Sequence, residues 1–271
     1  MTSIRLPEGT IDVLQAGEGR PLLLLHSLLA DRSVFDRVVP ALADTRRVIL
    51  PDLPGFGGST SAGATIAGIA DRIAGLFDAL DLPPETDVLG NGFGGFVAST
   101  LAIRHGARFD RLVLADTGIA FSEPGRAAFH AMADRVRTHG MEGVVDIAMK
   151  RLFPESFLAA HPDILAERRA GLVKTDPVLF AQACKALAAL DLSAEIGAIA
   201  NPVLVLVGEL DAATPPPMAE RLAAAIPGAT LVELPGLGHA PMAQDPDAFL
   251  AAVSDFLGLR RTQAIPARTR A

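Results

Sequence analysis

An aspartate and a histidine each come shortly after an apolar segment, which is where side chains that do chemistry stand in sheets of parallel strands. Asp211 follows PVLVLVG (202–208), and His239 follows TLVELP (230–235) in the loop GLGHAP. A lone loop aspartate or histidine is unremarkable, because the first often caps a helix. An imidazole oriented by a carboxylate is a general base, however, and this pair has the right order along the chain. Glu209, two residues before Asp211, is a rival acid.

A glycine-rich turn follows a third apolar segment. TDVLGN (86–91) runs into GNGFGG (90–95), where a helical pattern begins. Strand, sharp turn and helix is the context of the nucleophile elbow G-x-S-x-G, in which small flanking residues lift one residue above the sheet. Gly90 and Gly94 match that pattern, whereas the nucleophile position holds Gly92, which has no side chain. A phosphate-binding loop is the competing interpretation, and the lack of a following G-K-[ST] argues against it.

The elements that must position these residues alternate along the chain. Short apolar runs are typical of strands buried on both faces, and helical patterns fall between them. The alternation predicts an α/β fold with a mostly parallel, doubly wound sheet, preceded by an antiparallel hairpin and closed by a last helix. The predicted hairpin spans 1–18, the strands 21–26, 46–52, 86–91, 111–116, 202–208 and 230–235, and the helices 33–43, 65–80, 94–105, 216–226 and 246–257.

The strand pattern stops after RLVLAD, and amphipathic helical stretches replace it. We expect residues 118–199 to form a helical cap, inserted in a core made of residues 1–117 and 200–259. A cap between two strands of a parallel sheet most naturally covers the carboxyl edge, where such folds bind ligands. Residues 260–271 are rich in arginine and lack an apolar pattern, so we expect a disordered basic tail.

Two stretches resemble a known family. LLLLHSLLADRSVFDRVVPALADTRRVILPDLPGFGGS resembles the amino-terminal half of α/β hydrolases, with His26-Ser27-Leu28 where that family has its oxyanion loop. The cap stretch MEGVVDIAMKRLFPESFLAAHPDILAERRAGLVKTDPVLFAQACKALAALDL, with ELDAATPP after it, is similar to the 3-oxoadipate enol-lactonases. The resemblance covers residues 10–258. It implies an α/β-hydrolase fold and hydrolysis of a small ester or lactone, with no cofactor.

The resemblance also implies a role for each matching residue. His239 is the general base, Asp211 orients it, and the backbone N–H groups of Leu28 and Phe93 hold the oxyanion. The place of the nucleophile falls on Gly92, so a covalent acyl-enzyme at residue 92 is impossible. Loss of the serine from such a triad costs on the order of 10⁶ in kcat. The substrate pocket is expected to include His26, Ser27, Asn91 and Thr117.

Three accounts of Gly92 stay open. In the first, the acid–base pair activates a water molecule at the place of the missing hydroxyl. In the second, another side chain is the nucleophile: Ser27 on the oxyanion loop, Ser99 in the following helix, or Cys184 in the cap. Each of these three also has an ordinary interpretation as a loop, packing or buried apolar residue. In the third, the chain is a non-catalytic protein that keeps the pocket to bind a small ligand.

Composition limits the classes of partner. The net charge of −7 offers no basic patch for nucleic acid or for an anionic membrane surface. A single cysteine excludes an intramolecular disulfide, and no leader or membrane-spanning pattern is found. The six histidines lack the close spacing of a zinc site, so no metal is expected. We therefore expect a cytoplasmic protein with a small-molecule substrate, as a monomer or a homodimer.

Overall fold

The structure is a computed structural model that describes residues 1–259; the predicted tail at 260–271 lies outside the described residues. Within them, eight strands form one sheet in the order β1-β2-β4-β3-β5-β6-β7-β8. The pairs β1–β2 and β2–β4 are antiparallel and the others are parallel, which confirms the predicted mostly parallel sheet. The strands are β1 (Thr2–Leu6), β2 (Gly9–Ala16), β3 (Arg20–Leu25), β4 (Arg46–Pro51), β5 (Asp87–Asn91), β6 (Leu112–Ala115), β7 (Val203–Gly208) and β8 (Thr230–Leu234).

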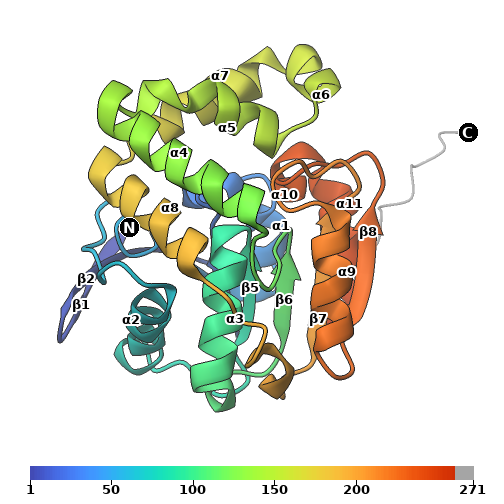
Figure 1. Ribbon diagram of the computed structural model, residues 1–271. Helices are drawn as coiled ribbons and strands as arrows, with labels where there is room; N and C mark the ends of the chain where they lie inside the picture. The colour runs from blue at the N-terminus through green and yellow to red at the C-terminus, as the bar shows by residue number, and fades with distance from the viewer. Residues whose placement is uncertain (260–271) are drawn as a thin grey trace, which may run out of the picture.

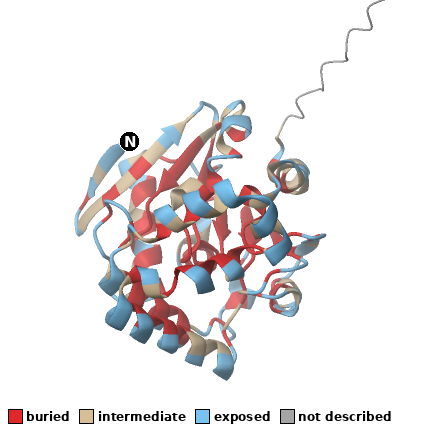
Figure 2. Ribbon diagram, turned by 90° about the horizontal axis from the view of Figure 1, so that it is seen from above, coloured by how far each residue is buried: buried red, intermediate tan, exposed pale blue. Residues whose placement is uncertain are grey.

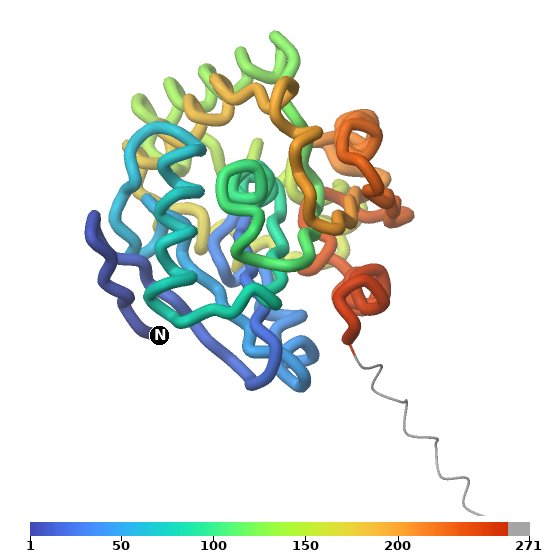
Figure 3. The backbone as a smooth tube through the Cα atoms, turned by 90° about the horizontal axis from the view of Figure 1, so that it is seen from below, coloured from blue at the N-terminus to red at the C-terminus, as the bar shows by residue number. Residues whose placement is uncertain are grey.

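Helices cover both faces of this sheet. Those of the core are α1 (Val39–Ala43), α2 (Ile66–Ala79), α3 (Phe93–His105), α9 (Pro216–Ala225), α10 (Pro241–Gln244) and α11 (Pro246–Leu257). Helices α2, α3 and α9 lie on one face, and α1 and α11 lie on the other (Figures 1 and 3). Every residue of β5 and β7 is therefore buried, and Figure 2 shows the buried residues gathered on the central strands. Strands covered on both faces are expected to be apolar throughout, as β7 is, whereas β5 carries Asp87 and Asn91 at its two ends.

The helix predicted at 33–43 is interrupted. The structure has a 3₁₀ turn at Arg32–Phe35, and α1 begins only at Val39. Pro40 explains the break, because proline lacks an N–H and its ring clashes with the preceding turn of a helix. It is tolerated in the first turn, and it lies there in α1.

Five helices between β6 and β7 lie above the carboxyl ends of the strands (Figure 1). Helices α4 and α8 pack along each other and close over the sheet. The buried residues of α4 are Phe129, Met132, Ala133 and Val136, whose spacing places them on one helical face. The cap helices are α4 (Glu123–His139), α5 (Val145–Leu152), α6 (Glu155–Ala160), α7 (Pro162–Leu172) and α8 (Pro177–Ala189).

Candidate active site

The turn between β5 and α3 is made by Gly92, whose backbone adopts φ 54° and ψ −115°. A residue with a β-carbon is strained in that region by about 1–3 kcal/mol. The Gly92 N–H donates to the Ala115 carbonyl oxygen at 2.9 Å, which ties the turn to β6. Two residues later, a β-carbon at Gly94 would overlap the Leu25 carbonyl group. Glycine at position 94 therefore lets α3 approach the end of β3.

Asp211 and His239 meet beyond the carboxyl ends of β7 and β8. Nδ1 of His239 lies 2.9 Å from Oδ2 of Asp211, and both side chains are buried. The Asp211 carboxylate also accepts hydrogen bonds from the Ala213 N–H at 2.7 Å, the Thr214 N–H at 3.0 Å and the Thr214 hydroxyl at 2.7 Å. A carboxylate oxygen is an acceptor, so Nδ1 of His239 is the donor in their hydrogen bond. Nε2 is left as the basic nitrogen.

The hydroxyl of Ser27 lies beside that basic nitrogen. Ser27 Oγ is 3.2 Å from His239 Nε2, and because Nε2 carries no proton the hydroxyl is the donor. Both groups stand where a side chain at position 92 would be. A β-carbon built on Gly92 would lie 2.6 Å from His239 Nε2 and 2.6 Å from Ser27 Oγ. The space left by the missing side chain is thus occupied by the imidazole and by the hydroxyl of a different serine.

Two backbone amides face the same region. The N–H groups of Leu28 and Phe93 make no hydrogen bond to any residue in the described part of the chain. Both residues line the same cavity as Ser27 and His239. Unpaired amides beside a base are the donors that stabilise a developing oxyanion.

His26 holds the loop that carries Ser27 and Leu28. Its Nδ1 donates to the Ser27 carbonyl oxygen at 2.9 Å, and its Nε2 accepts from the Leu53 N–H at 3.0 Å. The His26 carbonyl oxygen accepts from the Gly94 N–H at 2.9 Å, so the loop is also tied to the start of α3. Burial lowers the pKa of the His26 imidazole, and both ring nitrogens are used in the neutral form. His26 therefore positions the loop and does not line the cavity.

Two other expected pocket residues lie beneath the site. Asn91 Nδ2 donates to Asp116 Oδ2 at 3.1 Å and to the His239 carbonyl oxygen at 3.0 Å, so it ties the elbow strand to the histidine loop. Thr117 packs against Gly95, and its buried hydroxyl has no hydrogen-bond partner among residues 1–259. Neither residue lines the cavity. Sequence position placed both near the elbow, but the direction of their side chains is set by the packing of β5 and β6.

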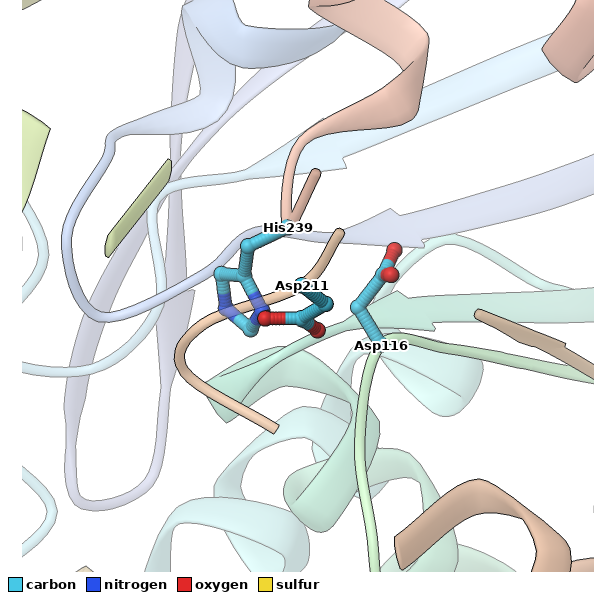
Figure 4. A group of neighbouring side chains, drawn as sticks. All are labelled: Asp116, Asp211 and His239. Carbon is cyan, nitrogen blue, oxygen red and sulfur yellow. The ribbon is translucent and has the colours of Figure 1, made fainter. Parts of the chain in front are cut away.

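Asp116, Asp211 and His239 form a buried cluster that no short sequence spacing announces (Figure 4). One potential ligand atom from each lies within 4.8 Å of the others, so their types and distances are compatible with a metal ion. Their oxygen and nitrogen atoms are already engaged in hydrogen bonds with one another, with backbone groups or with the side chains of Thr214, Asn91 and Ser27. Burial, and next the charge of Asp211, raise the pKa of Asp116 well above its usual value.

A small cavity opens over Gly92 and His239. The space in which the centre of a water-sized sphere fits is about 20 Å³, and about 10–15 Å³ suffices for one water molecule. A substrate therefore requires the cap side chains to move apart. The wall is mostly apolar and comes from the core and the cap, through Leu28, Leu29, Phe96, Phe121, Phe129 and Leu187.

One cation stands in this apolar wall. Arg151, on α5, lines the cavity, and its guanidinium forms no ion pair or hydrogen bond with any described residue. Burial lowers the pKa of its guanidinium, while the charge of Asp211 acts in the opposite direction. Sequence analysis did not single out this residue, because an arginine on an amphipathic helix is usually solvated.

The remaining candidates from the sequence have no contact with the base. Ser99 is buried in α3, and its hydroxyl has no hydrogen-bond partner in the described structure. Burial raises the pKa of Cys184 to about 12, so its thiol holds no thiolate of consequence at neutral pH. Glu209 accepts from the Gly236 N–H at 2.8 Å on the surface, away from His239. Of the side chains proposed as nucleophiles, only Ser27 reaches the imidazole.

Among residues 1–259, the structure has no helix with the length and apolar character needed to cross a bilayer.

Comparison with known proteins points to one family. Residues 22–252 match the family described as the alpha/beta hydrolase family. A pimeloyl-(acyl-carrier protein) methyl ester esterase of Aeromonas hydrophila is 30% identical over 262 residues, which cover 92% of this chain and 100% of the relative. The 3-oxoadipate enol-lactonase 2 of Acinetobacter baylyi is 29% identical over 237 residues, covering 86% and 87% of the two chains.

Solved structures give the same result. The enol-lactonase from Burkholderia xenovorans LB400 superposes with a TM-score of 0.89 at 31% identity, covering 95% of this chain and 100% of its own. A thermophilic esterase from Thermogutta terrifontis superposes with a TM-score of 0.86 at 32% identity, covering 95% and 96%. The resemblance to these hydrolases that the sequence motifs indicated is thereby confirmed.

Proposed function

The chain belongs to the alpha/beta hydrolase family, and we propose that it hydrolyses a small carboxylic ester or lactone with His239 as the general base. The observation that carries this proposal is a chain of hydrogen bonds from Asp211 through His239 to a hydroxyl at the cavity wall. Asp211 keeps the imidazole in the tautomer whose Nε2 accepts a proton.

Each polar group near the cavity has a role in acyl transfer. Nε2 of His239 removes a proton from the attacking oxygen and later delivers it to the leaving oxygen. The unpaired amides of Leu28 and Phe93 stabilise the negative charge on the carbonyl oxygen; one such donor is worth about 3–4 kcal/mol in comparable sites. At Gly92 there is no atom to acylate, so the attacking oxygen comes from elsewhere. Names of the relatives, an esterase and an enol-lactonase, support this reaction class.

Arg151 supports a narrower substrate class. A guanidinium in a mostly apolar cavity, with no carboxylate partner among the described residues, is costly unless an anion meets it during function. Arginine binds carboxylates through paired N–H donors. We therefore propose that the preferred ester or lactone carries a carboxylate, bound by Arg151 while the carbonyl group lies over Gly92.

The test is hydrolysis of p-nitrophenyl acetate and of a small enol-lactone by the parent chain and by His239→Ala. The parent should exceed the buffer rate, and His239→Ala should lose at least about a hundredfold in kcat/KM, the usual contribution of a general base. His130→Ala is the matched control, since His130 is exposed on the cap and lies outside the cavity. If parent and His239→Ala both hydrolyse no faster than buffer, hydrolysis is refuted and a non-catalytic binding protein remains; equal rates above the buffer rate would instead refute His239 as the base.

A further inference from the structure

We propose that Ser27 is the nucleophile of this chain, in place of the side chain that Gly92 lacks; the inference rests on the proposed ester or lactone hydrolysis. Ser27, His239 and Asp211 form an unbroken hydrogen-bond chain, 3.2 Å from Oγ to Nε2 and 2.9 Å from Nδ1 to Oδ2. A hydroxyl donating to an imidazole that a carboxylate orients is the arrangement that activates a serine. Here it is built on a serine that precedes the elbow by many residues.

The glycine and the serine are complementary. A β-carbon at position 92 would lie only 2.6 Å from Ser27 Oγ, closer than a carbon and an oxygen approach without overlap. Any side chain at position 92 would therefore push Ser27 or His239 out of their present contact. Gly92 is what allows the Ser27 hydroxyl to reach the base.

Two hydrogen bonds fix the backbone around Ser27. The Ser27 carbonyl oxygen accepts from His26 Nδ1 at 2.9 Å, and the preceding carbonyl oxygen accepts from the Gly94 N–H at 2.9 Å. The amide of Leu28 follows Ser27 directly, as the amide of Phe93 follows Gly92. An acyl group bonded to Ser27 would thus have an unpaired amide from the next residue beside its carbonyl oxygen.

Acylation and deacylation of Ser27 require water as the only co-reactant. Ser27 Oγ bonds to the carbonyl carbon as its proton passes to His239 Nε2, and the carbonyl electron pair moves to the oxygen held by the amides. That pair returns, the carbon–oxygen bond to the leaving group breaks, and Nε2 gives the leaving oxygen its proton. Water then attacks the acyl-Ser27 ester after losing a proton to Nε2, and Ser27 leaves as the alcohol with that proton.

The rival nucleophile is a water molecule, for which the cavity has room. Water is at a disadvantage at the base, because the Ser27 hydroxyl already occupies the acceptor site on Nε2. The position of the absent β-carbon cannot hold water either, since it lies about 1.5 Å from the Gly92 Cα, a bonded distance. Water would have to displace Ser27 before it could be activated.

Covalent trapping separates the two routes. The parent is incubated with a fluorophosphonate, which phosphonylates activated serines, and is digested with trypsin. Trypsin does not cleave between Arg20 and Pro21, so one tryptic peptide spans residues 6–32. Its single serine is Ser27. We expect the adduct mass on this peptide, together with a p-nitrophenol burst of about one equivalent from p-nitrophenyl acetate in the parent.

Variants complete the test. Ser27→Ala should lose the adduct, the burst and at least about a thousandfold in kcat. The matched control is Ser99→Ala, which removes a buried hydroxyl that has no partner among the described residues and should leave all three unchanged. Thermal unfolding of Ser27→Ala checks that it folds, and the trapping result on the parent does not depend on that variant.

The outcomes distinguish this inference from the proposed function. An active parent that forms no adduct on Ser27 and shows no burst overturns the nucleophile assignment, whether or not Ser27→Ala is impaired. An active Ser27→Ala together with an inactive His239→Ala would do the same and would favour water, while ester hydrolysis stands. A parent no faster than buffer would instead remove the proposed function itself.

Discussion

Asp116 and Asp211 place carboxyl oxygens within 4.8 Å of each other, and both side chains are buried. Two negative charges so close and so poorly solvated are unfavourable, so one of the two groups keeps its proton. Asp211 accepts hydrogen bonds from two N–H groups and a hydroxyl, while Asp116 accepts from the Gly208 N–H and from Asn91 Nδ2. Burial, and next the charge of Asp211, raise the pKa of Asp116 well above its usual value.

Asp116→Asn should change how stability depends on pH. A raised pKa means that the folded state binds a proton more tightly than the unfolded chain, so the parent loses stability as pH rises from about 3.8 through the folded pKa. The free energy of unfolding falls by about 1.4 kcal/mol for each unit by which the pKa is raised. Asparagine does not titrate, so the variant should not show this decrease. Urea unfolding of both proteins over a pH series measures this. Parallel curves for parent and variant would contradict it, and exposed Asp44→Asn is the control.

His26→Gln should change how stability depends on pH on the acid side, below about pH 6.5. The His26 pKa is lowered by burial, so the unfolded chain takes up a proton that the folded state resists. The parent is therefore expected to lose stability as pH falls below about 6.5 towards the folded pKa. In His26→Gln this part of the acid sensitivity should be absent, although its free energy of unfolding at pH 8 should be lower through loss of the Ser27 and Leu53 hydrogen bonds. His130→Gln, an exposed control, should retain the parent's acid sensitivity.

Gly92→Ser should exchange one nucleophile for another. The new β-carbon lies too close to Ser27 Oγ and His239 Nε2 for their present contact to persist, and its backbone conformation costs about 1–3 kcal/mol of stability. The hydroxyl of the new serine at position 92 then donates a hydrogen bond to His239 Nε2 in place of Ser27. Activity should become insensitive to Ser27→Ala in the Gly92→Ser background, while Ser27→Ala alone abolishes it.

Kinetics of the four proteins, parent, two single variants and the double variant, measure this non-additivity. Multiplicative effects of the two substitutions would show that Ser27 and position 92 do not compete for His239. Gly92→Ala is the control, because it introduces the same β-carbon without a hydroxyl and should be inactive.

Arg151→Gln should raise KM for an ester bearing a carboxylate by about 10- to 100-fold, the worth of a charge-assisted hydrogen bond. KM for a neutral ester of the same size should change little, because the apolar wall of the cavity remains. Lys150→Gln is the control, since Lys150 pairs with Glu155 on the surface at 3.3 Å. Equal changes in KM for the charged and the neutral ester would argue against carboxylate binding.

The sheet and the elbow could be predicted from the sequence because both are local. A continuously apolar run such as 202–208 identifies a doubly covered strand, and GNGFGG identifies a turn that only small residues can make. The pairing of Asp211 with His239 followed from their places after two such strands. Pro40 is a local signal against the continuous helix predicted at 33–43, because a proline fits in the first turn of α1 but not in a helix interior.

The contacts that decide the chemistry could not be predicted in this way. Ser27 and His239 are 212 residues apart in loops, and their approach depends on the direction that His26 gives to one loop and Asp211 to the other. The position of Arg151 depends on how the cap docks on the core, which no residue pattern within α5 specifies. Helical periodicity indicates which face is buried, but not against which neighbour.

The loop that His26 holds in place, which carries Ser27 and Leu28, combines two functions. Ser27 and Leu28 are consecutive, so a single loop presents both the attacking hydroxyl and a donor for the oxyanion, and one imidazole bridges it to Leu53. A displacement of that loop would change both the angle at which the Ser27 hydroxyl attacks and the hydrogen bond from the Leu28 N–H to the carbonyl oxygen. Substrate preference can therefore be tuned through the cap residues that line the cavity, such as Phe129 and Leu187, while the loop itself tolerates little change.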